Sequence, residues 1–159
     1  MHDVYEIYSE KDVCKYLLHS EWTPKNRQEE FNKKLKNHSL TQSDTLSLAV
    51  VCEGKVIGDL SAWYINMKNT MEIGYSFSAI SGGKGYATEA VGSLVKYLFD
   101  EYDVHRIQAT LDARNGASQK LCERIGMRKE AHFIQDYWNK NEWTDSMVYG
   151  ILNSEHRQK

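Results

Sequence analysis

The chain has 159 residues, of which 41% are hydrophobic, and a formal net charge of −2. This length is typical of one domain, so we expect residues 1–159 to form a single domain. The charge balance excludes a strongly basic surface, which argues against nucleic acid or an anionic membrane as a partner. Cys14, Cys52 and Cys122 are too few and too widely spaced for a disulfide framework or a zinc site. With no signal-peptide pattern, the sequence predicts a cytoplasmic protein without a metal.

Hydrophobic periodicity predicts helices in the first quarter of the chain and strands after them. One or two short helices are expected within residues 3–18, and a charged helix over residues 26–36, separated by a break at Trp22-Thr23-Pro24. Residues 46–52 begin the strand region. A hairpin turn at Glu53-Gly54 joins them to a second strand that runs to about Tyr64. A third strand is expected over residues 71–77.

The second half alternates between the two element types. The pattern predicts a helix over 86–99, a strand over 106–111, a helix over 118–125 that ends at Gly126, and strands over 127–134 and 144–152 around a turn at 139–141. This order predicts a mixed α/β fold with a mostly antiparallel sheet flanked by helices. A helical crossover joins the third and fourth strands, so these two should be parallel.

A glycine-rich turn, Gly82-Gly83-Lys84-Gly85, leads from the third strand into the helix that follows it. Glycines allow close approach of a ligand, and the first helical turn offers unpaired N–H groups, so this arrangement favours a phosphate-bearing ligand. The spacing is not that of a Walker A loop, because Gly85 rather than Ser or Thr follows Lys84. Nor does it match a dinucleotide fingerprint, since Thr88 stands where that motif has its last small residue. The alternative interpretation is a turn that binds nothing.

A second polar motif, Asn115-Gly116-Ala117-Ser118, opens the next helix. Asn and Ser are good N-terminal caps, and a cap alone would explain both residues. Their side chains can also reach a ligand that lies across the glycine loop.

Together these motifs resemble the GNAT superfamily of acyl-CoA N-acyltransferases, in particular its RimJ/RimL-like group. The resemblance covers residues 3–152 and rests on Glu72-Ile73-Gly74-Tyr75, the run from Gly83 to Ala90, Asn115-x-x-Ser118-x-x-Leu121 with Gly126-Met127, Asp136-Tyr137-Trp138, and Trp143-Thr144-Asp145.

The chain departs from the family in two places. Gly82 stands where the family usually has Gln or Arg. The family's usual first strand is absent from the expected elements, which would leave an exposed sheet edge open to pairing with another chain.

The resemblance implies that acetyl-CoA is the co-substrate and that a primary amine, either a protein N-terminus or a small molecule, attacks it directly in a ternary complex. It implies that the parallel strands splay apart around the pantetheine arm. The CoA-binding residues that it implies are Tyr75, Ser76, Phe77 and Ser78 for the pantetheine and thioester, Gly82, Gly83, Lys84, Gly85, Tyr86, Ala87 and Thr88 for the pyrophosphate, and Asn115 and Ser118 beside them.

The same resemblance suggests catalytic roles for three side chains. Glu72 is the candidate general base, with a surface carboxylate as the alternative. Tyr137 and Ser118 are candidate acids for the departing thiolate. Tyr137 can instead be a pocket aromatic, and Ser118 a helix cap. Lys84 either contacts a phosphate or is a solvated loop lysine.

Two other functions are consistent with the sequence. One is a non-catalytic CoA-binding sensor or interaction module, and the other is a phosphate-binding module for a different nucleotide. Because dimers are common in the superfamily, the resemblance also suggests a homodimer.

Overall fold

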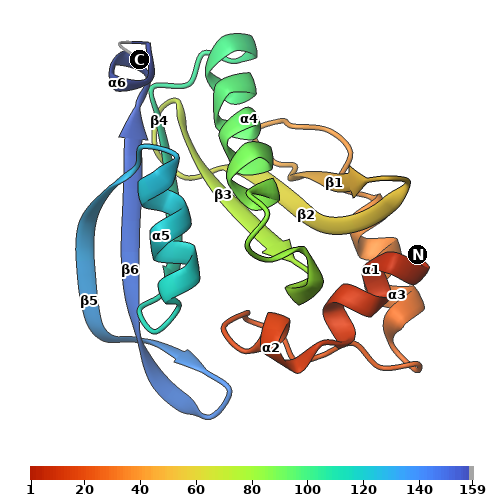
Figure 1. The fold of residues 1–159 in the computed structure, drawn as a ribbon. Helices are drawn as coiled ribbons and strands as arrows, with labels where there is room; N and C mark the ends of the chain where they lie inside the picture. Colours follow the sequence, from red (N-terminus) through yellow and green to blue (C-terminus); the bar gives the residue numbers. More distant parts are fainter. Residues whose placement is uncertain (158–159) are drawn as a thin grey trace.

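The structure is a computed structural model that describes residues 1–157. Its centre is a six-stranded sheet with the order β1-β2-β3-β4-β6-β5 (Figure 1). The predicted domain end at residue 159 lies outside the described residues. The strands are β1 (Leu46–Cys52), β2 (Lys55–Tyr64), β3 (Thr70–Phe77), β4 (Arg106–Asp112), β5 (Arg128–Asn139) and β6 (Glu142–Leu152). The helices are α1 (His2–Ser9), α2 (Lys11–Cys14), α3 (Arg27–Leu35), the 3-10 turn η1 (Ala79–Ser81), α4 (Tyr86–Glu101), α5 (Gly116–Arg124) and α6 (Asn153–His156).

The predicted order of elements and the mixed α/β class are confirmed. Every pair of neighbouring strands is antiparallel except β3 and β4, which are parallel as the crossover through α4 requires. In the described residues the first strand of the sheet is β1, and only α1, α2 and α3 precede it. The short helices η1 and α6 were not predicted, because neither is long enough to show a periodic hydrophobic pattern.

Both predicted hairpin turns form, with the positive φ angles that tight hairpins need. Glu53 and Gly54 have φ of 50° and 79° between β1 and β2. Lys140 and Asn141 have φ of 50° and 63° between β5 and β6. The flanking strands therefore twist together without a longer loop.

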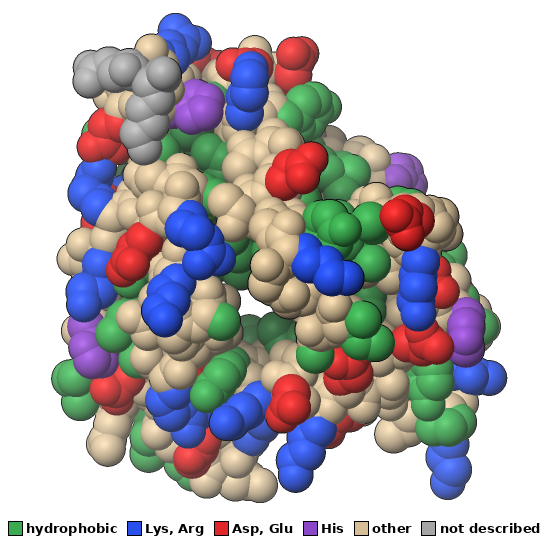
Figure 2. All heavy atoms as spheres, viewed as in Figure 1, with side chains coloured by type: hydrophobic (Ala, Val, Ile, Leu, Met, Phe, Trp, Pro, Cys, Tyr) green, Lys and Arg blue, Asp and Glu red, His purple; other side chains and the backbone are tan. Residues whose placement is uncertain are grey.

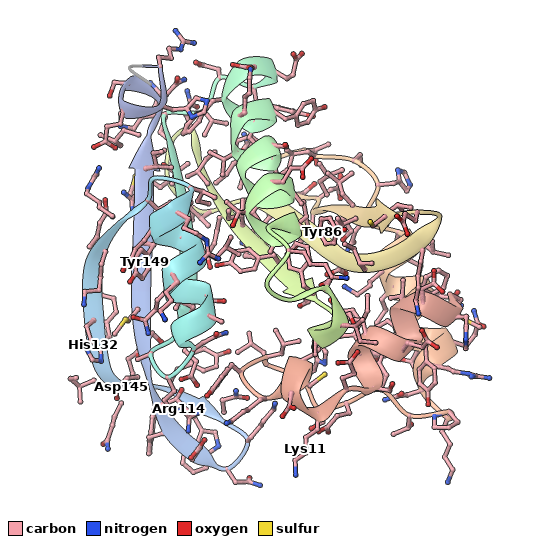
Figure 3. The ribbon with its side chains drawn as sticks, in the orientation of Figure 1. Lys11, Tyr86, Arg114, His132, Asp145 and Tyr149 are labelled. Atoms are coloured by element: carbon pink, nitrogen blue, oxygen red, sulfur yellow. The ribbon has the colours of Figure 1, made fainter. Side chains whose placement is uncertain are left out.

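Strand β5 is longer than predicted because it continues past a bulge. The sequence pattern stops at residue 134, but the strand runs to Asn139, and its register shifts between Phe133 and Tyr137. Gln135 has φ of 47°, and its N–H donates to Asp145 Oδ1 at 2.8 Å. The other carboxylate oxygen of Asp145 lies 2.9 Å from His132 Nε2 (Figure 3). Asp145 thus satisfies the backbone group that the bulge would otherwise leave unpaired.

The sheet carries helices on both faces. α4 and α5 pack on one face, where α4 buries five apolar residues against the main core. Those residues are Val91, Leu94, Val95, Leu98 and Phe99. Leu60 belongs to this core, whereas its neighbour Asp59 receives a hydrogen bond from Tyr8 of α1 at 2.6 Å. Because adjacent strand residues point to opposite faces, α1 and its small apolar cluster lie on the other face.

Leu98 tests how much the main core contributes to stability. Its side chain is fully buried (0% exposed), whereas Leu35 of α3 is 59% exposed. We expect Leu98→Ala to lower the free energy of unfolding by about 2–5 kcal/mol, because it leaves a cavity. Leu35→Ala makes the same chemical change on the surface and should alter it by less than about 0.5 kcal/mol. Urea denaturation of both variants measures the difference, and equal losses would contradict the assignment of this core.

Candidate active site

The sheet opens into a V between its two parallel strands. β3 and β4 pair at only three positions, Thr70 with Arg106, Met71 with Ile107 and Glu72 with Gln108. Beyond this point β3 stays paired with β2 as far as Phe77, and β4 stays paired with β6 as far as Asp112. The two strands therefore diverge, as the resemblance implied for a splayed pair.

The inner edge of β3 presents free backbone groups to the V. The N–H of Ser78 donates to Ile57 O on β2 at 2.9 Å, so the polar backbone groups of Ser78 and Ser76 face β2. Backbone direction alternates along a strand, so those of Tyr75 and Phe77 face the V. Of the predicted pantetheine residues, Tyr75 and Phe77 are thus placed to offer main-chain hydrogen bonds to a ligand. The Ser78 hydroxyl instead donates to Glu10 Oε1 at 3.0 Å.

A cavity of about 870 Å³ lies at the mouth of the V, over the N-terminus of α4. Gly83 and Gly85 have φ of 75° and 81°, and Gly85 is the N-cap residue of α4. Because the first residues of α4 line the cavity, beginning at Tyr86 (labelled in Figure 3), the unpaired N–H groups of this helix start are available to an anion there. The lining residues are Phe77, Ser78, Ser81, Gly82, Gly83, Gly85, Tyr86, Ala87, Thr88, Glu89 and Arg124. We call this cavity the cradle.

Two cations lie at or near the cradle. Lys84 does not line it and instead borders a neighbouring pocket between α1 and the β1–β2 turn. Arg124, at the end of α5, does line it and was not predicted. In the sequence, Arg124 is simply a basic residue in the last turn of a helix. Basic residues are common at that position because they interact with the helix dipole, so nothing in the sequence indicated a ligand there. At Gly82 a Cβ atom would lie 3.1 Å from the Ala79 carbonyl oxygen, so this glycine suits its tight turn.

A second pocket, of about 300 Å³, lies farther along the V and contains two of the predicted catalytic residues. Glu72 Oε2 accepts a hydrogen bond from Gln108 Nε2 at 2.8 Å, at the last pair before the strands separate. Tyr137 of β5 borders the same pocket. We call it the acceptor pocket, after the amine that the resemblance led us to expect here. Its other lining residues are Tyr16, Leu17, Leu18, Trp63, Ile73, Gly74, Thr110, Leu111, Asp112, Asn139, Thr144 and Ser146. The space-filling view shows an opening between α5, the glycine turn and α2 (Figure 2).

The two carboxylates of the acceptor pocket have different partners. Arg114, labelled in Figure 3, donates from Nε and an Nη to the two oxygens of Asp112, at 2.9 and 2.8 Å, and its other Nη donates to Glu142 at 2.9 Å. Burial raises the pKa of Asp112, but the hydrogen bonds from Arg114 outweigh it and hold that pKa below its ordinary value. Glu72 has the neutral Gln108 as its hydrogen-bond partner. Among the described residues, Asp112 is therefore paired with a cation, whereas Glu72 is bound to a neutral amide.

Asn115 and Ser118 form the cap at the start of α5. Asn115 Oδ1 accepts from the Ser118 N–H at 3.1 Å, which is the structural role that the sequence left open. Ser118 lines neither the cradle nor the acceptor pocket. Its carbonyl oxygen lies 3.5 Å from the hydroxyl of Tyr75, which also lies 3.2 Å from Cys122 Sγ. Burial raises the pKa of Tyr75, so its hydroxyl stays protonated at neutral pH.

The loop that closes one side of the acceptor pocket is held by the β5–β6 turn. Lys140 Nζ donates to the carbonyl oxygen of Cys14 at 2.5 Å, at the end of α2. Asn139 Nδ2 donates to the carbonyl oxygen of Leu17 at 3.3 Å. We call this pair of contacts the strap. It fixes Tyr16 and Leu17, which line the pocket, to a hairpin that is remote in sequence.

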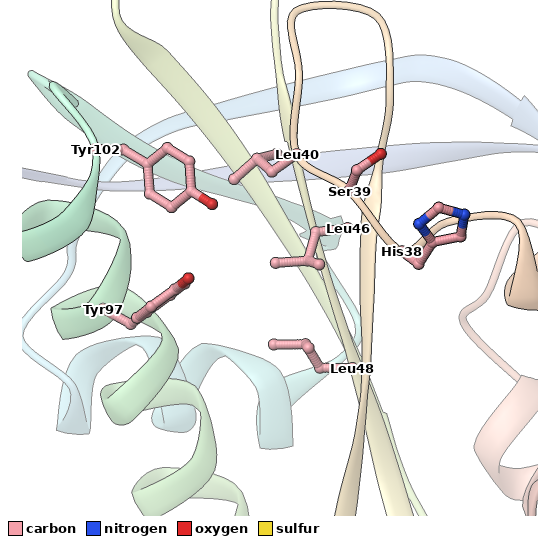
Figure 4. A pocket seen from close by; sticks show the side chains of 7 residues that line it. All are labelled: His38, Ser39, Leu40, Leu46, Leu48, Tyr97 and Tyr102. Carbon is pink, nitrogen blue, oxygen red and sulfur yellow. The ribbon is translucent and has the colours of Figure 1, made fainter.

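A further hollow, of about 530 Å³, lies beside the edge strand β1 (Figure 4). Its lining is His38, Ser39, Leu40, Leu46, Leu48, Tyr97 and Tyr102. It contains no Lys or Arg side chain and no helix start, so it lacks the chemistry of a phosphate site.

Two other features were searched for over residues 1–157. No group of three or more His, Cys, Asp or Glu side chains is arranged to hold a metal ion there. In the same residues, none of the helices has both the length and the apolar character needed to span a membrane.

Comparison with known proteins agrees with this geometry. Residues 1–128 match the family described as "Acetyltransferase (GNAT) domain". The chain belongs to the GNAT family. It is 32% identical to the uncharacterized N-acetyltransferase YnaD of Bacillus subtilis, over 96% of this chain and 87% of that one. It is also 32% identical to a GNAT-family acetyltransferase from Bacillus anthracis of known structure, with a TM-score of 0.84, over 97% and 89% of the two chains.

A third similarity concerns the fold. RimL, a ribosomal L7/L12 alpha-N-protein acetyltransferase solved with coenzyme A, has a TM-score of 0.81 at 16% identity, over 94% of this chain and 86% of RimL. The family match and the two relatives at 32% identity show that the GNAT protein described here is an acetyl-CoA-dependent N-acetyltransferase, with acetyl-CoA as its co-substrate.

Gly85 tests the backbone conformation of the cradle. Its φ of 81° lies in the left-handed region, and no atom lies within 4 Å of an added Cβ. Gly85→Ala should therefore lower the free energy of unfolding by about 1–2 kcal/mol through backbone strain alone. Its CoA affinity should fall as well. Gly116→Ala, which has equal space and no positive φ, should leave stability unchanged or raise it by up to about 1 kcal/mol. Thermal denaturation with and without CoA measures both effects, and equal behaviour of the two variants would disprove the assignment.

Lys140 tests the strap. Lys140→Met keeps an unbranched side chain that is one atom shorter, and removes the ammonium that donates to the Cys14 carbonyl. The loop at Tyr16 and Leu17 should loosen, so the KM for the amine should rise about tenfold while the Kd for CoA stays within about twofold. Lys129→Met, on an exposed part of β5 and outside both cavities, is the matched control. An unchanged amine KM in Lys140→Met would show that the strap does not shape the pocket.

Proposed function

We propose that this GNAT protein transfers the acetyl group to a primary amine by direct attack in a ternary complex. The observation that carries the proposal is the position of the two cavities at one V. The cradle suits the phosphates of acetyl-CoA, and the acceptor pocket holds a carboxylate and a phenol farther along the same gap. Pantetheine extended between the strands would carry the thioester from the first cavity toward the second.

In this proposal Glu72 acts as the general base. An amine is mostly protonated near neutral pH, so a base must remove a proton before or during attack. Glu72 accepts that proton directly or through one water. The amine nitrogen then bonds to the thioester carbon, and the carbonyl oxygen becomes an oxyanion. The inward-facing N–H of Tyr75 or Phe77 is placed to donate a hydrogen bond to that oxygen.

Collapse of the intermediate breaks the C–S bond and releases the CoA thiolate. We assign the acid to Tyr137, because its side chain shares the acceptor pocket with Glu72. Ser118 is the second candidate, and its place at the start of α5 is closer to the donor side. The ammonium form of the amine loses two protons in all. One is lost when the amine becomes a neutral nucleophile and is released to solvent, and the second, lost from nitrogen as the amide forms, balances the proton given to sulfur. The products are the acetylated amine, free CoA and one proton.

The acceptor pocket favours an amine whose neighbouring groups carry no charge. Leu17, Leu18 and Trp63 line it, and its second carboxylate, Asp112, is already paired with Arg114. A protein N-terminus with an uncharged first side chain, or a small primary amine without a second charged group, would fit this lining. The structurally similar RimL is named for acting on the N-terminus of a ribosomal protein.

The function is tested by incubating the protein with acetyl-CoA and a panel of amines. The panel should contain short peptides with free N-termini, the same peptides with blocked N-termini, and small primary amines with and without a second charged group. We expect thiol release, together with a mass increase of one acetyl group, only for free amines whose neighbouring groups carry no charge. CoA binding without thiol release for any amine would support the non-catalytic alternative instead.

Glu72→Gln tests the general base. This change keeps the size and the polar contact but removes the carboxylate, so kcat should fall by about 10²-fold or more while the Kd for CoA stays within about twofold. Glu101→Gln, at the exposed end of α4 and far from both cavities, controls for loss of charge. A kcat equal to that of the wild type across the pH range would exclude Glu72 as the base.

Tyr137→Phe and Ser118→Ala, compared in parallel, decide which residue is the acid. The variant that lacks the acid should lose about 10²-fold in kcat and lose the alkaline limb of its pH profile. The other variant should retain both.

A further inference from the structure

Arg124 occupies an unusual position for a residue at a helix end. It is the last residue of α5, and its Nε donates to Thr88 Oγ1, in the first turn of α4, at 3.0 Å. This contact joins the two helices on either side of the cradle and brings the guanidinium to the cavity wall. Thr88 therefore fixes the orientation of Arg124 before any ligand is bound.

The charges around the cradle make Arg124 distinctive. Among the residues that line the cavity, Glu89 and Arg124 are the charged ones, so Arg124 supplies the positive side chain. Lys84, the cation that the sequence suggested, borders a different pocket. The remaining attraction for an anion comes from backbone N–H groups and the α4 dipole.

A purely structural role does not use all of the guanidinium. A cation in the last turn of a helix interacts favourably with the helix dipole. The hydrogen bond to Thr88 also links α4 to α5. These roles occupy one of the five N–H donors of the guanidinium. Within residues 1–157, no carboxylate forms an ion pair with Arg124. The planar guanidinium has further N–H donors at the wall of the cradle, and their arrangement matches that of the oxygens of a phosphate group.

We propose that Arg124 binds a phosphate group of CoA through its free guanidinium donors, with Thr88 as the residue that positions it. The inference rests on the proposed placement of CoA in the cradle. It adds a side-chain ligand to a site that otherwise relies on the backbone. The group that Arg124 contacts is either the pyrophosphate or the 3′-phosphate of CoA. Both belong to the same ligand and present the same kind of oxygens to a guanidinium.

Binding of CoA to the variants, measured by isothermal titration calorimetry, tests the proposal. Arg124→Gln should weaken CoA binding about tenfold, the size expected for loss of one charge-assisted contact. Arg124→Lys should recover part of the loss, since it keeps the charge without the fork. Thr88→Val should show a smaller loss, because it removes only the group that orients the guanidinium. Arg128→Gln removes the same charge from β5, outside the cradle, and should stay within about twofold.

The same titrations with dephospho-CoA identify the phosphate. If Arg124 contacts the 3′-phosphate, Arg124→Gln should weaken CoA but not dephospho-CoA, which lacks that group. If it contacts the pyrophosphate, both ligands should weaken equally. Either pattern supports the proposal.

Two results would overturn it: CoA affinity in Arg124→Gln equal to the wild type, or an equal loss in Arg128→Gln. Melting temperatures without ligand show whether Arg124→Gln is folded. If it is not, the CoA affinities of Arg124→Lys and Thr88→Val test the proposal in its place. Failure of the wild type to bind CoA would instead reject the placement of CoA in the cradle. If the wild type binds CoA and Arg124→Gln binds it with the same affinity, the role of Arg124 is rejected while the placement of CoA stands.

Discussion

Backbone hydrogen bonds join β3 to β4 over only three residue pairs, and the extent of this short ladder sets the geometry of the site. Each strand keeps its other neighbour beyond the ladder, so the sheet stays intact while its centre opens. The opening leaves main-chain donors and acceptors of Tyr75 and Phe77 without a strand partner. In the proposed function, these free groups pair with the amides of an extended pantetheine arm, as they would with a neighbouring strand.

The proposed function requires a protein of net charge −2 to hold a polyanion. The cradle concentrates oriented N–H groups and one guanidinium, and these act locally whatever the total charge is. At the acceptor pocket the opposite arrangement holds, because Arg114 pairs with Asp112 and leaves Glu72 bound to a neutral amide. The two ends of the V thus differ in the charges they present to a substrate.

Much of the fold could be predicted because it follows from short-range patterns. The helix of α4 follows the apolar spacing from residue 87 to residue 98, and the turn at Glu53-Gly54 follows from its residue types. The crossover rule then made β3 and β4 parallel. Strand β5 was predicted too short because a bulge at Gln135 interrupts its pattern, and the side chain that stabilises this bulge, Asp145, lies on another strand.

The sequence by itself determined the order of elements, the glycine turn at the start of α4 and the family resemblance, since these depend on residues near one another in the chain. The tertiary structure alone decided which side chains meet. Arg124 lies 36 positions from Thr88, Gln108 lies 36 from Glu72, and Lys140 lies 126 from the Cys14 carbonyl. Periodicity and turn chemistry act over a few residues. Contacts across such separations follow from how helices and strands pack, so Arg124 and the strap became visible only in the folded chain.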